Sequence, residues 1–164
     1  MIFLTVGSHE PFDRLVIAVD DWCQKRKEKP HILGQITARA GYRPKGFAAV
    51  DNLSPAEFEA EFGRASLVVA HAGMGTILTA LSRSKPIIVM PRRGHLGETR
   101  NDHQYATAIH LPKRAGLWIA RDETELPDLL EKVLQSGGAA GPAIEPFAGG
   151  DLIDSLRNFI FRKN

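Results

Sequence analysis

The sequence of 164 residues contains a single cysteine, Cys23, which excludes an internal disulfide and favours a reducing compartment. Cys23 falls on the apolar stripe of an expected helix, where a small buried side chain is its expected role. No stretch approaches 18 uninterrupted apolar residues, so no transmembrane helix is expected. The short apolar N-terminus lacks a basic region, and we expect it to form a strand instead of a signal peptide.

The sequence also has little excess charge of either sign, with 21 Lys and Arg against 19 Asp and Glu. A nucleic-acid-binding module usually shows a large clustered basic excess, so none is expected here. No metal site is expected either, because the six histidines show neither the H-E-x-x-H pattern nor Cys and His at ligand spacing. Hydrophobic residues make up 43% of the chain, which suffices for one domain over residues 1–164.

Short apolar runs alternate with segments of helical period along nearly the whole chain. We expect strands at residues 2–6, 31–36, 47–50, 66–70, 87–90 and 117–120. We expect helices at residues 12–25, after the capping-box pattern at 54–57, and at 73–84, 101–109, 126–134 and about 150–162. This alternation predicts an α/β fold, a Rossmann-like three-layer sandwich in which helices cover both faces of a parallel sheet. Ligands of such sheets bind beyond the carboxyl ends of the strands.

The segment His71–Thr76 follows an expected strand and opens an expected helix. Gly73 and Gly75 would let a ligand approach the backbone, and free amides at a helix N-terminus bind phosphate. Thr76 adds a hydroxyl donor. A tight turn without a ligand would have the same pattern. The segment is not a complete dinucleotide motif, because Leu78 stands in place of the third glycine, and it is neither a P-loop nor a hydrolase nucleophile elbow.

Two further loops carry polar residues after expected strands. Gly7 and Ser8 follow the first strand and would present an amide and a hydroxyl to the same phosphates, although Ser8 would also suit a turn or a helix cap. The neighbouring His9 is a candidate base or phosphate contact, and a surface histidine would look the same.

The segment 98–104 is dense in hydrogen-bonding side chains at the start of an expected helix. Sugar hydroxyls are bound by side chains of this kind, so we expect Glu98, Asn101, His103 and Gln104 to contact substrate. The alternative is a solvated first turn in which the helix dipole favours acidic residues.

Taken together, the three loops resemble the donor-binding C-terminal half of the GT-B glycosyltransferases of family 28, which includes the bacterial enzyme that makes lipid II. The match is closer to free-standing halves of that fold, the small subunits of two-chain glycosyltransferases. Residues 2–15 and 97–104 look like the bacterial exopolysaccharide type, and the resemblance covers about residues 1–120.

This resemblance implies a role for each loop. Gly7 and Ser8 would lie near the diphosphate of a UDP-sugar donor, and residues 71–76 would form the second phosphate loop. Asn101, His103 and Gln104 would reach the donor sugar. Thr79 stands where many members of the family carry a glutamate that holds the ribose, which weakens the expected grip on the nucleoside unless Glu98 or a partner chain substitutes.

The resemblance also implies an inverting transfer of glucose, glucuronic acid or N-acetylglucosamine to a lipid-linked saccharide, with no metal or other cofactor. His9 is the candidate base. Arg92, Arg93 or Arg100 would pair with a uronate carboxylate, although ordinary exposed arginines would look the same. The acceptor site would come from a membrane-associated partner subunit, to which Met74 or the 152–160 helix would dock unless those apolar residues belong to the core. The chain is therefore expected to be cytoplasmic and peripheral at the inner face of the membrane through that partner.

Other functions are compatible with the same fold. A non-catalytic nucleotide-sugar-binding or scaffold subunit would share these loops while another chain performed the turnover. An NAD-dependent Rossmann enzyme is disfavoured because the glycine motif is incomplete. A nucleic-acid-binding module ranks last, because basic residues do not cluster.

Overall fold

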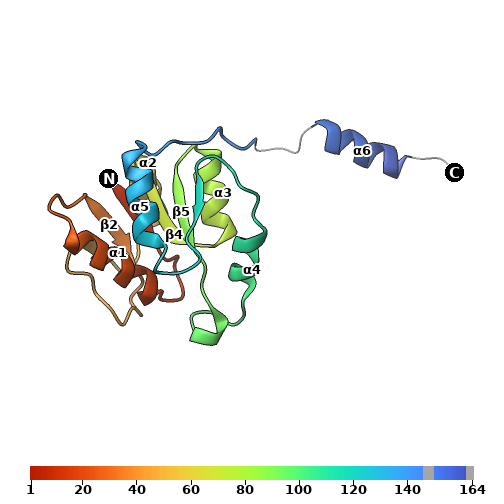
Figure 1. Cartoon of the computed structure of the whole chain (residues 1–164). Coiled ribbons are helices and arrows are strands. Elements are labelled where there is room, and N and C mark those ends of the chain that lie inside the picture. Colours follow the sequence, from red (N-terminus) through yellow and green to blue (C-terminus); the bar gives the residue numbers. More distant parts are fainter. Residues whose placement is uncertain (146–149, 162–164) are drawn as a thin grey trace.

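The computed structural model describes residues 1–145 and 150–161 and shows six parallel strands in the order β3-β2-β1-β4-β5-β6 (Figure 1). The strands are β1 Ile2–Thr5, β2 Ile32–Gln35, β3 Ala48–Val50, β4 Leu67–His71, β5 Ile87–Met90 and β6 Leu117–Ile119. The helices are α1 Asp13–Lys25, α2 Pro55–Arg64, α3 Met74–Ser82, α4 His103–His110, α5 Leu126–Gln135 and α6 Gly150–Ile160, with a 3-10 turn, η1, at Gly94–Leu96.

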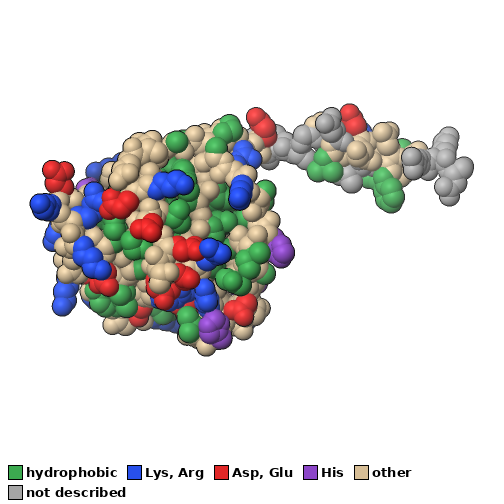
Figure 2. Space-filling view, in the orientation of Figure 1, with side chains coloured by type: hydrophobic (Ala, Val, Ile, Leu, Met, Phe, Trp, Pro, Cys, Tyr) green, Lys and Arg blue, Asp and Glu red, His purple; other side chains and the backbone are tan. Residues whose placement is uncertain are grey.

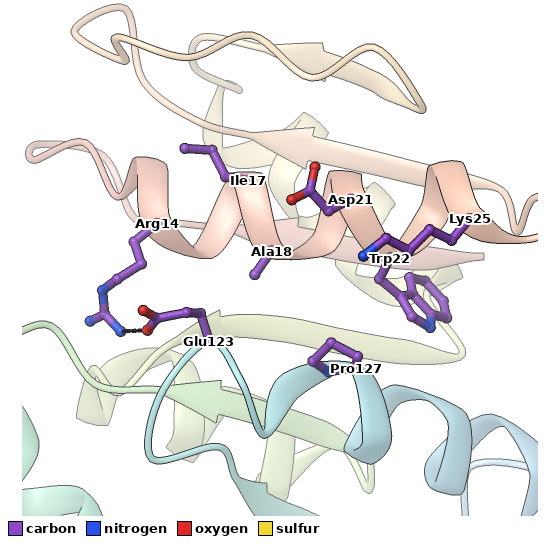
Figure 3. Close-up of a pocket in the computed structure, with 8 residues that line it drawn as sticks. All are labelled: Arg14, Ile17, Ala18, Asp21, Trp22, Lys25, Glu123 and Pro127. Carbon is purple, nitrogen blue, oxygen red and sulfur yellow. Dashed lines mark hydrogen bonds and ion pairs between the residues drawn. The ribbon is translucent and has the colours of Figure 1, made fainter.

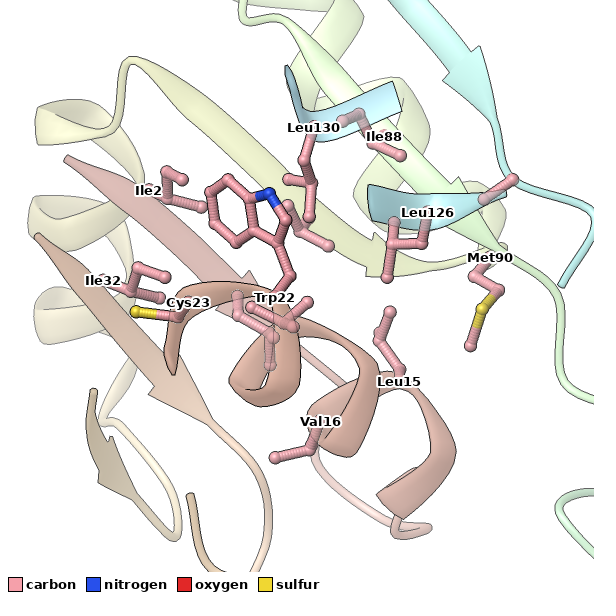
Figure 4. Packing of buried hydrophobic residues seen from close by; sticks show 14 of the residues in the cluster. Ile2, Leu15, Val16, Trp22, Cys23, Ile32, Ile88, Met90, Leu126 and Leu130 are labelled. Atoms are coloured by element: carbon pink, nitrogen blue, oxygen red, sulfur yellow. The ribbon is translucent and has the colours of Figure 1, made fainter. Parts of the chain in front are cut away.

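The core lies in two layers because alternate residues of a strand point to opposite faces of the sheet. On one face Leu4 of β1 packs in a cluster with residues of α1 and α5, and on the other Phe3 packs with residues of α2 and α3. Figure 4 shows the first layer, where Trp22 of α1 lies near Leu130 of α5 and Leu15 of α1 lies near Leu126 of α5. The predicted Rossmann-like sandwich is confirmed.

The predicted helices and strands are present, and their ends differ from the prediction by at most two residues. Cys23 is fully buried, as expected, and the Ser54–Glu57 capping box forms at the start of α2. The helix expected at residues 101–109 begins at His103 instead, because Asp102 accepts a hydrogen bond from the amide of Gly94 and lies in the preceding turn. Residue 162 of the expected C-terminal helix lies outside the described residues.

Helix α6 lies apart from the sheet and its covering helices in Figure 1. Its Leu152, Phe159 and Ile160 are 55%, 79% and 67% exposed, so these positions are not part of the core. Figure 2 shows the domain surface beside it, where cationic and anionic side chains are interspersed. No helix of the described residues is long and apolar enough to cross a membrane.

Candidate functional site

The strand order reverses between β1 and β4, which lie side by side at the centre of the sheet. At such a switch point the loops after the two strands separate and leave a crevice for ligands. A cavity of about 340 Å³ occupies this place, at the small end of the range for ligand sites. It is lined by Val6, Gly7, Ser8, His9, Glu10, His71, Gly73, Gly75, Thr76, Arg92, Thr99 and Gln104.

The structure thus brings together the first two predicted loops and one of the predicted site residues of the third. The loop after β1 contributes its three predicted residues, and the end of β4 and the start of α3 contribute His71, Gly73, Gly75 and Thr76. Gln104 reaches the same cavity from the first turn of α4. Its Oε1 accepts a hydrogen bond of 3.2 Å from the amide of Arg92, which leaves its NH2 group to donate toward a ligand.

Glu98, Asn101 and His103 do not line this cavity. Both carboxylate oxygens of Glu98 accept hydrogen bonds from the Arg14 guanidinium, at 2.7 and 2.8 Å, and one also accepts from the amide of Arg93. Glu98 therefore fastens the loop after β5 and is not free to hold a ribose. Asn101 and His103 are exposed and hydrogen-bond to one another.

The N-terminus of α3 supplies the donors of the site. Gly73 is its N-cap and gives no side-chain cap, so the first-turn amides of Met74, Gly75 and Thr76 lack the partners that later helical amides have. Such amides and the positive end of the helix dipole attract anions. The amide of Gly7 donates instead to Thr5 Oγ1 at 3.2 Å, so it is not the free phosphate donor that the sequence suggested. Gly7 contributes to the cavity by lacking a side chain.

The His71 ring leaves little room for a side chain at two glycine positions, Gly7 and Gly73. A Cβ on Gly73 would lie 2.9 Å from His71 Cδ2 and closer still to Nε2, although the φ of Gly73, −91°, is an ordinary one. A Cβ on Gly7 would lie 3.1 Å from His71 Cε1, and its φ of +88° also favours glycine. The ring is therefore enclosed between the two loops.

His71 is neutral at pH 7 in this position. Burial, reinforced by the positive charge of Arg92, lowers the pKa of His71 to about 4, against the opposing effect of the Thr5 backbone. Its Nδ1 is buried with no hydrogen-bond partner in the described part of the chain. A neutral ring can donate one hydrogen bond to a phosphate but adds no charge.

Gly75 differs from Gly73 because, apart from its chain neighbours and the backbone of its own helix, no atom lies within 4 Å of the place where its Cβ would be. Glycine in a helix costs about 1 kcal/mol relative to alanine, so the fold alone would favour alanine here. Thr79, one turn later, donates its hydroxyl proton to the Gly75 carbonyl at 2.8 Å. That proton is therefore not available for a hydrogen bond to a ribose hydroxyl.

Sequence reasoning missed the part that Arg92 takes in the site and did not single out Thr99, which also lines the cavity. Arg92 is 3% exposed and forms the floor of the crevice, whereas the sequence suggested an exposed arginine. Arg93 turns away and donates to the carbonyl of Arg121 at 3.1 Å. Neither is therefore placed as the simple uronate partner that the sequence allowed.

A second groove, of about 470 Å³, lies between α1 and the start of α5 (Figure 3). Apolar groups of Ile17, Trp22 and Pro127 line it, and the Arg14–Glu123 ion pair closes one end. No residue of the loops after β1 and β4 lines it in the described structure, so its walls lack the convergent amides of the switch point. Within the described residues, no group of three His, Cys, Asp or Glu side chains is placed to hold a metal ion.

The family model for the glycosyltransferase family 28 C-terminal domain matches residues 1–141. The chain belongs to this family. The match covers the whole sheet and all the residues of the switch-point cavity.

The chain is also similar to a protein named UDP-N-acetylglucosamine transferase subunit ALG13, from Cryptococcus neoformans var. neoformans serotype D. It is 39% identical over 79 residues, which are 47% of this chain and 36% of that protein. The match therefore spans only about a third of the length of that relative.

Two solved structures share the fold. The solution structure of ALG13 has a TM-score of 0.55 and 19% identity, covering 94% of this chain and 93% of that one. A putative UDP-N-acetylglucosamine 2-epimerase from Listeria monocytogenes has a TM-score of 0.59 and 13% identity, covering 99% of this chain and 46% of that one. At these identities the likeness concerns the fold alone.

Proposed function

We propose that this chain is the donor-binding subunit of a two-chain glycosyltransferase and binds the diphosphate of a UDP-sugar at the β1–β4 switch point. The uncapped amides of α3 carry this proposal, because they converge on a cavity that both glycine loops line. Membership of family 28 supports the activity, and the ALG13 relative is named as a UDP-N-acetylglucosamine transferase subunit. The amides would stabilise the negative charge that develops on the leaving UDP.

The acceptor side is proposed to come from a partner subunit that is attached to the membrane and holds a lipid-linked saccharide. The exposed Leu152, Phe159 and Ile160 of α6 offer an apolar surface for that partner. In this arrangement the chain works at the inner face of the membrane without entering it. A glucose, glucuronic acid or N-acetylglucosamine donor fits the proposal equally, and a screen of labelled UDP-sugars with the reconstituted complex would identify the sugar.

His9 is the proposed base of an inverting transfer that needs no metal. It is exposed on the cavity rim, and its Nδ1 lies 2.8 Å from Ser8 Oγ. A base in this place would take the proton of the acceptor hydroxyl as it attacks the sugar. In the two-chain complex, His9→Ala is expected to bind UDP normally and lose turnover. Full turnover by this variant would remove the role.

Gly75→Ala tests the donor site because it should change stability and affinity in opposite senses. The new methyl group meets no protein atom, so the helix should gain about 0.5 kcal/mol of stability. The same methyl group would stand where the phosphate approaches the amides, so UDP binding should weaken by about tenfold or more. Thermal unfolding and calorimetric titration with UDP measure the two effects.

Gly63→Ala is the matched control for this experiment. Gly63 lies in α2, and no protein atom lies within 4 Å of the place where its Cβ would be. It does not line the cavity, so its substitution should stabilise the protein similarly and leave UDP affinity unchanged. If Gly75→Ala also binds UDP as the wild type does, the diphosphate does not approach α3 and the proposed function fails.

A further inference from the structure

Arg92 joins the two sides of the crevice through backbone carbonyls. Its Nη1 donates to Pro11 O at 2.8 Å and to Glu98 O at 3.3 Å. Its Nη2 donates to Val6 O at 2.5 Å and to Glu10 O at 2.8 Å. One side chain after β5 therefore holds the whole loop after β1 in place, including the segment that carries Gly7, Ser8 and His9.

The charge of this guanidinium is not neutralised within the described structure. Its four acceptors are uncharged carbonyls, the Phe12 ring lies 5.0 Å away, and no carboxylate of residues 1–145 lies within 4.0 Å. Glu10 and Glu98 act on it only from longer range. Arg14, by contrast, is paired directly with Glu98 and Glu123.

A buried charge without an ionic partner destabilises a folded protein, so packing alone does not account for an arginine at position 92. Burial lowers the pKa of Arg92, but an arginine starts so far above neutrality that it stays protonated at pH 7. Arg92 is the one Lys or Arg among the cavity-lining residues of the described structure. The effect of its charge on the pKa of His71 shows that its field reaches the glycine loops.

We infer that Arg92 is a positioning residue that shapes the loop after β1 and supplies the positive field that makes the crevice select a diphosphate. The missing counter-charge is the ligand itself. This inference rests on the proposed donor site. It adds that the charge of Arg92 makes the cavity prefer a diphosphate over a monophosphate or an uncharged nucleoside. Because its N–H groups already donate to backbone carbonyls, Arg92 does not hydrogen-bond the sugar directly. It acts through its electric field and through the position of the loop after β1.

Arg92→Gln removes the charge and keeps a hydrogen-bonding amide. Arg92→Lys keeps the charge and loses the planar set of guanidinium N–H donors. Titration of each variant with UDP, UMP and uridine separates charge from shape. Arg92→Gln is expected to weaken UDP by about tenfold or more, UMP by about threefold, and uridine hardly at all. Arg92→Lys is expected to keep the wild-type ratio of UDP to uridine affinity.

Arg93→Gln is the matched control, because it removes the same charge from the neighbouring residue, which donates to Arg121 O away from the cavity. Its affinities should stay within about twofold of the wild type. Equal weakening of UDP and uridine by Arg92→Gln would reduce Arg92 to a structural role and overturn the inference. If Arg92→Gln does not fold, loss of the UDP-to-uridine ratio in Arg92→Lys overturns it as well. Failure of the wild type to bind UDP would instead sink the proposed function.

Discussion

Gly73→Ala is expected to lower the free energy of unfolding by about 2–3 kcal/mol and to abolish UDP binding. The new Cβ would lie 2.9 Å from His71 Cδ2 and closer still to Nε2, and the loop after β1 closely approaches the other side of the ring, where a Cβ built on Gly7 would lie 3.1 Å from Cε1. The clash must therefore be relieved by moving the backbone that begins α3. Urea unfolding and calorimetric titration with UDP measure the two losses.

The ring explains this effect only if its removal restores stability. In the double variant Gly73→Ala with His71→Ala, most of the destabilisation caused by Gly73→Ala should disappear, giving a coupling energy of about 1.5 kcal/mol or more in a double-mutant cycle. Additive losses would mean that the alanine at position 73 collides with something other than the ring. The adjacent Gly75→Ala should be stable, which contrasts two glycines that look alike in the sequence.

The sequence was sufficient to predict the fold because its signals are local. Short apolar runs such as Ile87–Met90 are fully buried strands, and the capping box at Ser54 begins α2 as expected. Only the ends of elements moved by a residue or two. The same reasoning places the candidate loops together, because parallel strands bring their carboxyl ends to one edge, and a cavity lies there.

The side chains of the site could not all be predicted, because long-range contacts decide where they point. Glu98 looked like a sugar ligand, but Arg14, which is 84 residues earlier in the chain, holds both of its oxygens. Arg92 looked like an exposed cation, but it lies beneath the loop after β1. A local pattern states which groups are polar and does not reveal which partners already occupy them.

The contacts of Glu98 and Arg92 concern the same loop. Arg14 and Glu98 fasten the outer side of the loop after β5, while Arg92 from that loop fastens the loop after β1. Charged residues that a sequence motif assigns to ligand binding here hold the backbone instead. A ligand in the cavity would therefore contact mainly amides, hydroxyls and neutral rings, which suits the diphosphate of the proposed donor.

The neutrality of His71 makes the protein sensitive to acid. The pKa of His71 is lowered to about 4 in the folded protein, by burial first and by Arg92 second, from an ordinary value of 6.5. As the pH falls below 6.5, the unfolded chain gains a proton that the folded protein accepts only near pH 4. Stability is therefore full above pH 6.5 and is lost through this window, by about 2 kcal/mol between pH 7 and pH 5.

His71→Asn isolates this contribution because asparagine does not titrate. The pKa values of Glu123 and Glu131 are lowered mainly by hydrogen bonds from Arg14 and Arg26, so their contributions are lost only at lower pH. Urea unfolding at pH 7, 6 and 5 should give a steep loss in the wild type and a nearly flat profile in the variant. Equal slopes would mean that His71 carries a proton in the folded state, and that the site holds two cations where the structure places one.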